Sequence, residues 1–231
     1  MARDVILACD FPDARATVSF LQQFKGQKPF VKIGMELFYG AGPSIVHTLK
    51  EMGHKIFLDL KLHDIPNTVK KAMRVLSGLE IDLCNVHAAG TVAMMEAALE
   101  GLTAPDGKRP QLIAVTQLTS TSSAQLHDEL GIPDSMEETV IRYARNAKAA
   151  GLDGVVCSPL ETRGIKEACG DSFLAVTPGI RYPSDDKGDQ TRVTSPADAK
   201  RLGSDYIVVG RPITAAPDPV AAYERVLKDF L

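Results

Sequence analysis

The sequence predicts a single closed (β/α)8 barrel, the TIM-barrel architecture, from three observations. Eight short apolar runs recur along the chain, a segment with helical spacing of apolar residues follows each run, and no second-domain break divides the 231 residues. Strands that alternate with helices are typical of α/β proteins with a parallel sheet, and barrels of this length fold as one domain. We therefore expect residues 1–231 to form one barrel domain.

The eight apolar runs have the composition of strands that are covered on both faces. Val, Ile, Leu and Phe dominate them without strict alternation, as is typical of buried parallel strands. The expected strands are Val5–Asp10, Phe30–Gly34, Lys55–Lys61, Ile81–His87, Gln111–Leu118, Gly154–Ser158, Phe173–Thr177 and Tyr206–Gly210.

Amphipathic segments between these runs predict the helices of the outer layer. They are Ala14–Phe24, Ile45–Met52, Thr68–Ser77, Val92–Leu99 and Glu137–Ala150, with Pro219–Leu227 after the last strand. Asn67 and Thr91 are candidates for helix N-caps. An open doubly wound sheet is the alternative fold. It normally carries a GxGxxG turn after the first strand, which Asp10-Phe11-Pro12-Asp13 does not resemble.

Composition and charge narrow the classes of function. A formal net charge of −3, a pI near 6.0 and dispersed Lys and Arg give no electrostatic basis for binding nucleic acid or an anionic membrane. No stretch approaches the roughly 20 apolar residues of a membrane span, and the N-terminal apolar run is too short for a secretion signal. The four cysteines form no CxxC pair, which favours buried, reduced thiols. We expect a cytoplasmic protein with no nucleic-acid or membrane partner.

Charged side chains gather at the expected carboxyl ends of the first three strands, where barrel enzymes place their catalytic groups. Asp10 ends the first run, Lys32 lies in the second, Asp59 and Lys61 lie in the third, and Asp64 follows at the next turn. Asp59 and Lys61 are two residues apart, so in a regular strand their side chains leave the same face. Charges among apolar neighbours are costly unless they are paired or functional.

Two interpretations of these charges remain open, a buried structural ion-pair network and a catalytic array. An array of ammonium and carboxylate groups requires no His or Cys nucleophile. An ammonium stabilises a developing carbanion and then protonates it, and a carboxylate beside a substrate carboxylate repels it. The array therefore suits a decarboxylation. The scattered His and Asp residues make no recognisable metal-ligand set, so we expect no metal site.

The last two expected strands end in turns that combine glycine with arginine, Gly179 with Arg181 and Gly210 with Arg211. Barrels often bind phosphate with the loops after strands seven and eight, where glycine lets backbone N–H groups approach and arginine adds a charged clamp. Structural turns are the alternative. The long polar segment at about 181–195 follows the seventh strand and is expected to be a lid rather than a plain connection.

The segment Phe57–Val69 strongly resembles the DxKxxD signature of the orotidine 5'-phosphate decarboxylase family, including the following Ile65–Val69. DxKxxD alone is shared with sugar-phosphate enzymes of the same superfamily, whereas this extension, Gln190 and the Gly210–Arg211 pair make the resemblance close. The other matching segments, which extend it over essentially the whole chain, are Ala8–Asp10, Val31–Gly34, Asn85–Ala88, Gln117–Ser120, Thr177–Arg181 and Val209–Pro212.

This resemblance implies that the protein converts orotidine 5'-monophosphate to uridine 5'-monophosphate, the last step of de novo UMP synthesis. It implies a homodimer that works without metal or organic cofactor. Lys61 is expected to protonate C6 of the pyrimidine within a Lys32–Asp59–Lys61–Asp64 array, with Asp64 and Thr68 delivered across the dimer interface. The expected substrate ligands are Asp10 and Lys32 at the ribose, Thr119 at the pyrimidine, and Arg181, Gln190, Gly210 and Arg211 at the phosphate and lid; Lys32 is also expected to hold Asp59.

Two alternatives to this activity remain. One is a magnesium-dependent sugar-phosphate decarboxylase or synthase of the same superfamily, against which the continuation His63–Asn67 argues. The other is a non-catalytic sensor of a phosphate ligand. A sensor would keep the glycine–arginine turns but has little reason to retain two lysines and two aspartates at the strand ends.

Overall fold

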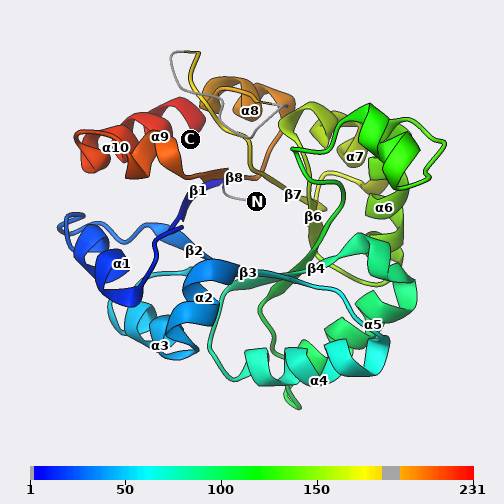
Figure 1. The fold of residues 1–231 in the computed structure, drawn as a ribbon, viewed down its shortest axis with the longest axis horizontal. Coiled ribbons are helices and arrows are strands. Elements are labelled where there is room, and N and C mark those ends of the chain that lie inside the picture. Colours follow the sequence, from blue (N-terminus) through cyan, green and yellow to red (C-terminus); the bar gives the residue numbers. More distant parts are fainter. Residues whose placement is uncertain (1–2, 184–192) are drawn as a thin grey trace.

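The barrel expected from the sequence is present in the computed structural model, which describes residues 3–183 and 193–231 (Figure 1). In the described chain the sheet closes in the order β1 to β8, and every neighbouring pair of strands, β8 with β1 included, is parallel. The open doubly wound alternative is therefore wrong. The strands are β1 (Asp4–Ala8), β2 (Phe30–Gly34), β3 (Ile56–Leu62), β4 (Leu83–His87), β5 (Gln111–Val115), β6 (Gly154–Val156), β7 (Leu174–Thr177) and β8 (Tyr206–Val209).

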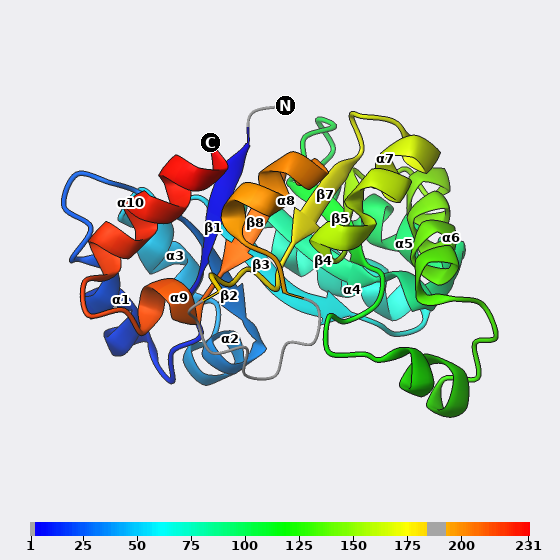
Figure 2. The same cartoon turned by 90° about the horizontal axis from the view of Figure 1, so that it is seen from above.

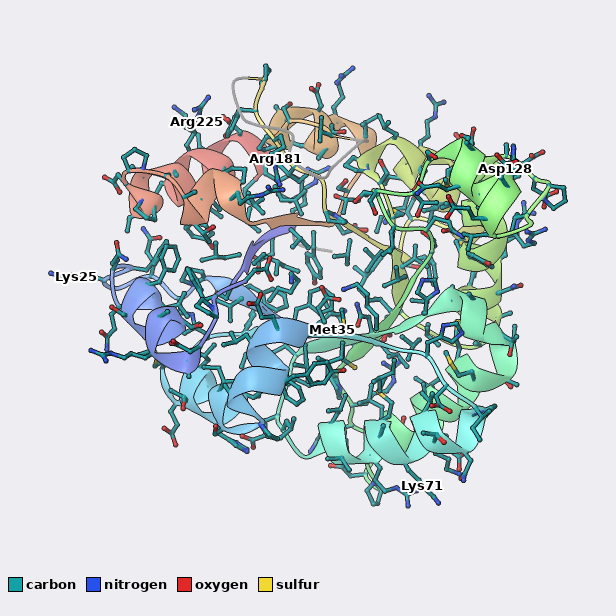
Figure 3. The ribbon with its side chains drawn as sticks, viewed as in Figure 1. Lys25, Met35, Lys71, Asp128, Arg181 and Arg225 are labelled. Atoms are coloured by element: carbon teal, nitrogen blue, oxygen red, sulfur yellow. The ribbon has the colours of Figure 1, made fainter. Side chains whose placement is uncertain are left out.

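Helices form a ring around the strands, as Figure 1 shows in the view down the barrel. The α-helices are α1 (Ala14–Leu21), α2 (Met35–Ala41), α3 (Ser44–Glu51), α4 (Pro66–Ser77), α5 (Thr91–Leu102), α6 (Met136–Ala149), α7 (Thr162–Cys169), α8 (Pro196–Leu202), α9 (Arg211–Thr214) and α10 (Pro219–Phe230). Short turns of other helix types are η1 (Ala88–Gly90), η2 (Gln125–Glu129) and η3 (Pro159–Glu161). In Figure 3 the labelled Lys25, Lys71 and Asp128 lie at the outer edge of this ring.

Both expected helix N-caps are wrong by one or two residues. Helix α4 starts at Pro66 with Ile65 as its N-cap, because proline has a φ angle suited to the first helical position and needs no N–H there. Asn67 is therefore already inside the helix. Helix α5 starts at Thr91 with Gly90 as its N-cap, because the η1 turn leads directly into it.

The apolar core has an outer and an inner part. The outer part packs helix side chains against the strands and includes the four cysteines, which are buried as expected and form no disulfide in the described chain. The inner part draws its side chains from strands alone, which places it inside the barrel. Its buried members are Ile6, Ala8, Phe30, Phe57, Leu83, Ile113, Val176 and Val208.

One step further along the strands, the inward-facing layer becomes polar. Lys32, Asp59 and Asn85 each lie two residues beyond an inner-core side chain of the same strand, so they share its face. This polar layer lies toward the C-terminal ends of the strands. In Figure 2, β1 runs downward from the N-terminus, and the short helices α2 and α9 lie at the lower, C-terminal end of the barrel. The fold thus brings charge to the end where barrel enzymes act.

The N-terminal end of the barrel carries a different set of charges. Asp82, Asp153 and Asp205 each lie directly before an even-numbered strand. Each carboxylate accepts a backbone N–H at the start of the neighbouring odd-numbered strand and also pairs with a cation. The sets are Asp82 with Ile56 N and Lys50, Asp153 with Leu112 N and Arg109, and Asp205 with Ala175 N and Lys166.

Among the residues that the structure describes, the longest apolar helices fall short of what a bilayer crossing requires.

Candidate active site

Charged residues from the first three strands meet at the C-terminal end of the barrel, as the sequence predicts. Asp59 on β3 lies between two ammonium groups, with its Oδ1 2.7 Å from Lys61 Nζ and its Oδ2 3.3 Å from Lys32 Nζ. Lys32 Nζ also lies 3.0 Å from Oδ1 of Asp10, which follows β1. The side chains of Lys32 and Asp59 are each 11% exposed, whereas that of Lys61 is 29% exposed. The outermost ammonium is therefore accessible to a ligand.

Electrostatics keep the buried Lys32–Asp59 pair ionised. Burial opposes the charged form of Lys32, but the carboxylates of Asp59 and Asp10 outweigh it and raise the pKa of Lys32 above its ordinary value. Burial likewise opposes ionisation of Asp59, but Lys32, Lys61 and the hydrogen bonds to its carboxylate hold its pKa below the ordinary value. A carboxylate and an ammonium with such shifts stay charged over the whole neutral range. Lys32 and Asp59 are therefore a fixed pair of opposite charges rather than a proton-sharing pair.

Sequence reasoning assigned no role to Asn85, which completes the array from β4. Its Nδ2 donates to Asp59 Oδ1 at 2.7 Å, and its Oδ1 accepts from the backbone N–H of Lys61 at 2.8 Å. Asn85 is buried, with 1% of its surface exposed. The signal in the sequence was an amide inside the apolar run of the fourth strand, because a buried amide needs hydrogen-bond partners.

Asp59 and Lys61 converge for a reason that regular strand alternation does not supply. Leu58 pairs with Cys84 whereas Leu62 pairs with Val86, so β3 advances four residues while β4 advances two. Lys61 has a φ of 52°, in the left-handed region that non-glycine residues seldom adopt. The expectation that the two side chains meet is confirmed, but a bulged strand brings them together.

The array forms one wall of a cavity of about 190 Å³ inside the mouth of the barrel. The cavity combines this charged wall with apolar side chains and with polar groups after β5, and Thr119 lines it as expected. Its lining residues are Lys32, Phe57, Asp59, Lys61, Val115, Gln117, Leu118, Thr119, Ser120, Val156, Cys157, Pro178 and Val208. A flat, partly polar ring placed here would contact both the apolar side chains and the ammonium of Lys61.

Gly179 follows Pro178, which lines this cavity, whereas Arg181 lines a separate pocket of about 420 Å³. Gly179 has a φ of 79°, which a residue with a side chain adopts only with strain. At Gly210 a Cβ would lie 3.5 Å from Ala8 Cβ and 3.9 Å from Asp10 Oδ2, so this backbone passes close to the array. Arg211 follows as the first residue of α9 and is exposed. Figure 3 shows Arg181 on the side of the C-terminal helices.

The segment expected to be a lid is described only at its two ends. Arg181 N donates to Thr194 O at 3.0 Å, and Thr194 N donates to Gly179 O at 3.0 Å. These bonds hold the two ends of the segment side by side after β7. Residues 184–192, and with them the expected ligand Gln190, lie outside the described residues.

Asp64 and Thr68 share a pocket with Lys61 but do not pair with the charges of the array in the described chain. Within residues 3–183 and 193–231, Asp64 forms no ion pair, and its Oδ1 accepts from Ile65 N at 2.6 Å. Both residues are exposed and border a second pocket of about 320 Å³, which Lys61 and Tyr39 also line. Tyr39, which lines this pocket, is 69% exposed, and Ile65, next to Asp64 in the chain, is 66% exposed, so large side chains with apolar surface are exposed here.

No group of three or more His, Cys, Asp or Glu side chains suited to hold a metal ion occurs in the described part of the chain. Its histidines at the array, His63 and His87, stack on each other with ring centroids 5.4 Å apart. Burial, His63 and the charge of Lys61 together lower the pKa of His87.

A family model, a curated relative and a solved structure all indicate the same protein family. The family model described as "Orotidine 5'-phosphate decarboxylase / HUMPS family" matches residues 3–226. A protein of Geobacillus sp. (strain WCH70) named orotidine 5'-phosphate decarboxylase is 59% identical over 97% of this chain and 95% of its own length. The crystal structure of orotidine 5'-phosphate decarboxylase from Lactobacillus acidophilus superposes with a TM-score of 0.87, at 45% identity over 99% of both chains. An uncharacterized conserved protein from Geobacillus kaustophilus has the same TM-score, at 52% identity over 98% of this chain and 100% of its own.

Proposed function

The chain belongs to the orotidine 5'-phosphate decarboxylase / HUMPS family, and we propose that it decarboxylates orotidine 5'-monophosphate to uridine 5'-monophosphate with its Lys32–Asp59–Lys61 array. This reaction is the last step of UMP biosynthesis. The observation that carries the proposed mechanism is a carboxylate held between two ammonium groups at the wall of a largely apolar cavity.

The reaction requires a group that stabilises negative charge at C6 and then supplies a proton there. When the C6–carboxylate bond breaks, CO2 leaves and the electron pair stays on C6. The Lys61 ammonium lies at the cavity wall, so it stabilises this developing carbanion and donates a proton to form the C6–H bond. Lys61 is then neutral and regains a proton from water before the next turnover.

The Asp59 carboxylate contributes a fixed negative charge beside the reacting group during the decarboxylation. Its carboxylate is held by Lys61, Lys32 and Asn85, so its position needs no reorganisation during the reaction. A substrate carboxylate placed beside it is repelled, and this repulsion disappears when neutral CO2 forms. The apolar walls of the cavity strengthen both effects because they exclude water.

The rest of the nucleotide is bound by groups around the array. Asp10 and Lys32 are the proposed ligands of the ribose hydroxyls, and Thr119 that of the pyrimidine. Support comes from the Asp10–Lys32 pair, from the position of Thr119 in the cavity and from the passage of Gly210 beside Asp10. The proposed phosphate ligands are Gly210, Arg211, Arg181 and Gln190. Phosphate binding at a distance from C6 then helps to position the reacting ring.

We propose further that the protein is a cytoplasmic homodimer whose sites are shared. Asp64 and Thr68 are exposed beside apolar Tyr39 and Ile65, as expected of residues that a second subunit covers. In a two-fold dimer each chain would give its Asp64 to the array of the other. The four buried cysteines, which form no disulfide among the described residues, support a reducing compartment.

The activity is tested by following the absorbance of orotidine 5'-monophosphate with purified protein, with and without EDTA. We expect conversion to the product spectrum at the same rate in both samples. Activity that chelation removes and magnesium restores would indicate the sugar-phosphate branch of the superfamily. Binding without turnover would indicate a sensor.

The shared site is tested by mixing two inactive homodimers, Lys61→Ala and Asp64→Asn, after dissociation. In a mixed dimer one site carries both defects and the other carries neither. Random pairing makes half of the dimers mixed, so about a quarter of the parent activity should return. If mass spectrometry shows mixed dimers and the sample stays inactive, Asp64 serves its own chain.

A further inference from the structure

We propose that Asn85 is a positioning residue for the decarboxylation, and that its amide aims the Lys61 ammonium by joining the Asp59 carboxylate to the Lys61 backbone across the β3–β4 bulge. The inference rests on the proposed function, because it concerns the same array. Asn85 binds Asp59 and Lys61 and is not among the residues that line the cavity in the described chain.

The position of Asn85 in the sheet explains why one side chain reaches both partners. Strands β3 and β4 pair at Leu58–Cys84 and again at Leu62–Val86. Between these two pairs β4 has one residue, Asn85, while β3 has three, Asp59, Leu60 and Lys61. Asn85 therefore faces the whole bulged stretch. Its Nδ2 lies 2.7 Å from Asp59 Oδ1 and its Oδ1 lies 2.8 Å from Lys61 N.

The two partners fix the orientation of the amide. A carboxylate only accepts hydrogen bonds and a backbone N–H only donates them, so Nδ2 must face Asp59 and Oδ1 must face Lys61. Both ends of the buried amide are satisfied in this orientation alone. Rotation of the amide by 180° would break both bonds and would place like groups in contact.

The backbone of Lys61 depends on this support. A non-glycine residue with a φ of 52° is strained, and such a conformation persists only where its surroundings hold it. In a bulge the ladder hydrogen bonds of the extra residues are lost. The side-chain oxygen of Asn85 takes the place of the missing strand acceptor for the Lys61 N–H. Losing it would let the backbone relax and would change where the ammonium points.

Asn85 also fixes the counterion of Lys61. Asp59 Oδ1 receives Asn85 Nδ2 and Lys61 Nζ, both at 2.7 Å, while Oδ2 faces Lys32. A neutral amide adds a hydrogen bond here without adding charge to the array. In the described part of the chain Asn85 is not among the residues that line the cavity, so it acts through its two neighbours and not on the substrate.

The first test replaces Asn85 with Ala and compares the variant with Ser204→Ala. Ser204 lies in the loop before β8 and is also buried, at 1% exposure. Its hydroxyl accepts a hydrogen bond from Thr177 on β7, so Ser204→Ala removes a buried hydrogen bond outside the array. We expect Asn85→Ala to lower kcat by about tenfold or more, the scale of one to two lost hydrogen bonds to charged or strained groups. The Kd for UMP should change by less than about threefold. Ser204→Ala should keep the parent kcat.

The second test uses Asn85→Asp, which keeps the shape and the acceptor for Lys61 N but loses the donor to Asp59. The introduced carboxyl is buried and faces the Asp59 carboxylate, with Lys61 and Lys32 as the nearby cations, so burial and repulsion favour its protonated form. Once protonated, it can donate to Asp59 as the amide does. We therefore expect kcat of this variant, relative to the parent, to rise as pH falls from 8 to 6.

The outcomes separate this inference from the proposed function. A parent protein that does not turn over orotidine 5'-monophosphate overturns the function itself. An active parent with an unchanged kcat in Asn85→Ala, or a loss in kcat matched by an equal loss in UMP affinity, overturns the role of Asn85. If Asn85→Ala does not fold, the pH profile of Asn85→Asp decides, and a profile parallel to that of the parent rejects the inference.

Discussion

The two ends of the barrel use buried charge in opposite ways. At the N-terminal end, Lys166 Nζ donates to Asp205 at 2.6 Å and to the backbone oxygens of Asp171 and Phe173. Asp205 in turn accepts the backbone N–H of Ala175. Each charged group is satisfied by the protein, and the side chains of Lys166 and Asp205 are 14% and 15% exposed. Such a cluster ties strands and helices together.

At the C-terminal end the charges are arranged around an opening. Lys61 pairs with Asp59 and also borders the cavity, its side chain is 29% exposed, and its backbone is strained. An arrangement that places a partly exposed ammonium on a strained backbone is poorly suited to stability. Similar Lys–Asp pairs thus differ in what else each charged group binds. The N-terminal pairs are closed, whereas the C-terminal array is left open to a ligand.

Replacement of Lys61 by Ala should have the largest effect on activity. It would remove both the positive charge and the proton source that we propose at C6, so we expect turnover to fall by orders of magnitude. Binding of the product UMP should survive better than catalysis because UMP needs no proton. Steady-state kinetics and UMP titration measure the two quantities. An active Lys61→Ala variant would end the proposed mechanism.

Replacement of Lys166 by Met should have the next largest effect, on stability and not on activity. It leaves Asp205 buried without its cation, so we expect the free energy of unfolding to fall by about 3 kcal/mol. Arg163→Met is a matched control on the same helix α7, because the Arg163–Glu167 pair is largely exposed and should matter little. Urea unfolding measures both variants. If the two variants are equally stable, the N-terminal ion pairs do not stabilise the fold. If a folded Lys166→Met variant loses kcat, the N-terminal pairs also serve activity, and the proposed contrast between the two ends of the barrel is wrong.

Replacement of Arg211 by Ala should have the smallest of the three effects. If Arg211 binds the phosphate, kcat/KM for orotidine 5'-monophosphate should fall by about 2 kcal/mol in transition-state free energy. Orotidine, which lacks the phosphate, should be a poor substrate of the parent and should lose much less on the same replacement. Equal losses for the two substrates would remove Arg211 from the phosphate site.

The fold could be predicted because its signal is local and repeated. Each apolar run marked a strand, and the strand ends placed Asp10, Lys32, Asp59 and Lys61 at one end of the barrel before any contact was known. Eight strand–helix repeats in a row favoured a sheet that closes into a barrel. These inferences depend on periodicity and chain order, which a single sequence contains.

The details of the site depended on register, which the sequence does not show. Nothing in the run containing Asn85 reveals that it faces a bulge, or that Lys61 adopts a left-handed conformation there. Regular strand alternation correctly predicted that Asp59 and Lys61 are neighbours, but the bulge in β3 is what brings them together. The partner of Asp64 could not be found either, because among the described residues its carboxylate accepts the N–H of Ile65 and forms no ion pair with the array. The repeated aspartate before β4, β6 and β8 was visible in the sequence but gained meaning only from the strand pairing.

We infer that the open array serves activity and that the closed pairs serve stability. The most direct test is the free energy of unfolding of Lys61→Ala, measured by urea titration beside the parent at equal protein concentration. Asp59 keeps Lys32 and Asn85 as partners in this variant, so we predict a stability within about 1 kcal/mol of the parent, in a protein that has lost its turnover. A loss of about 3 kcal/mol or more, the scale expected for Lys166→Met, would contradict the claim and make Lys61 a structural tie.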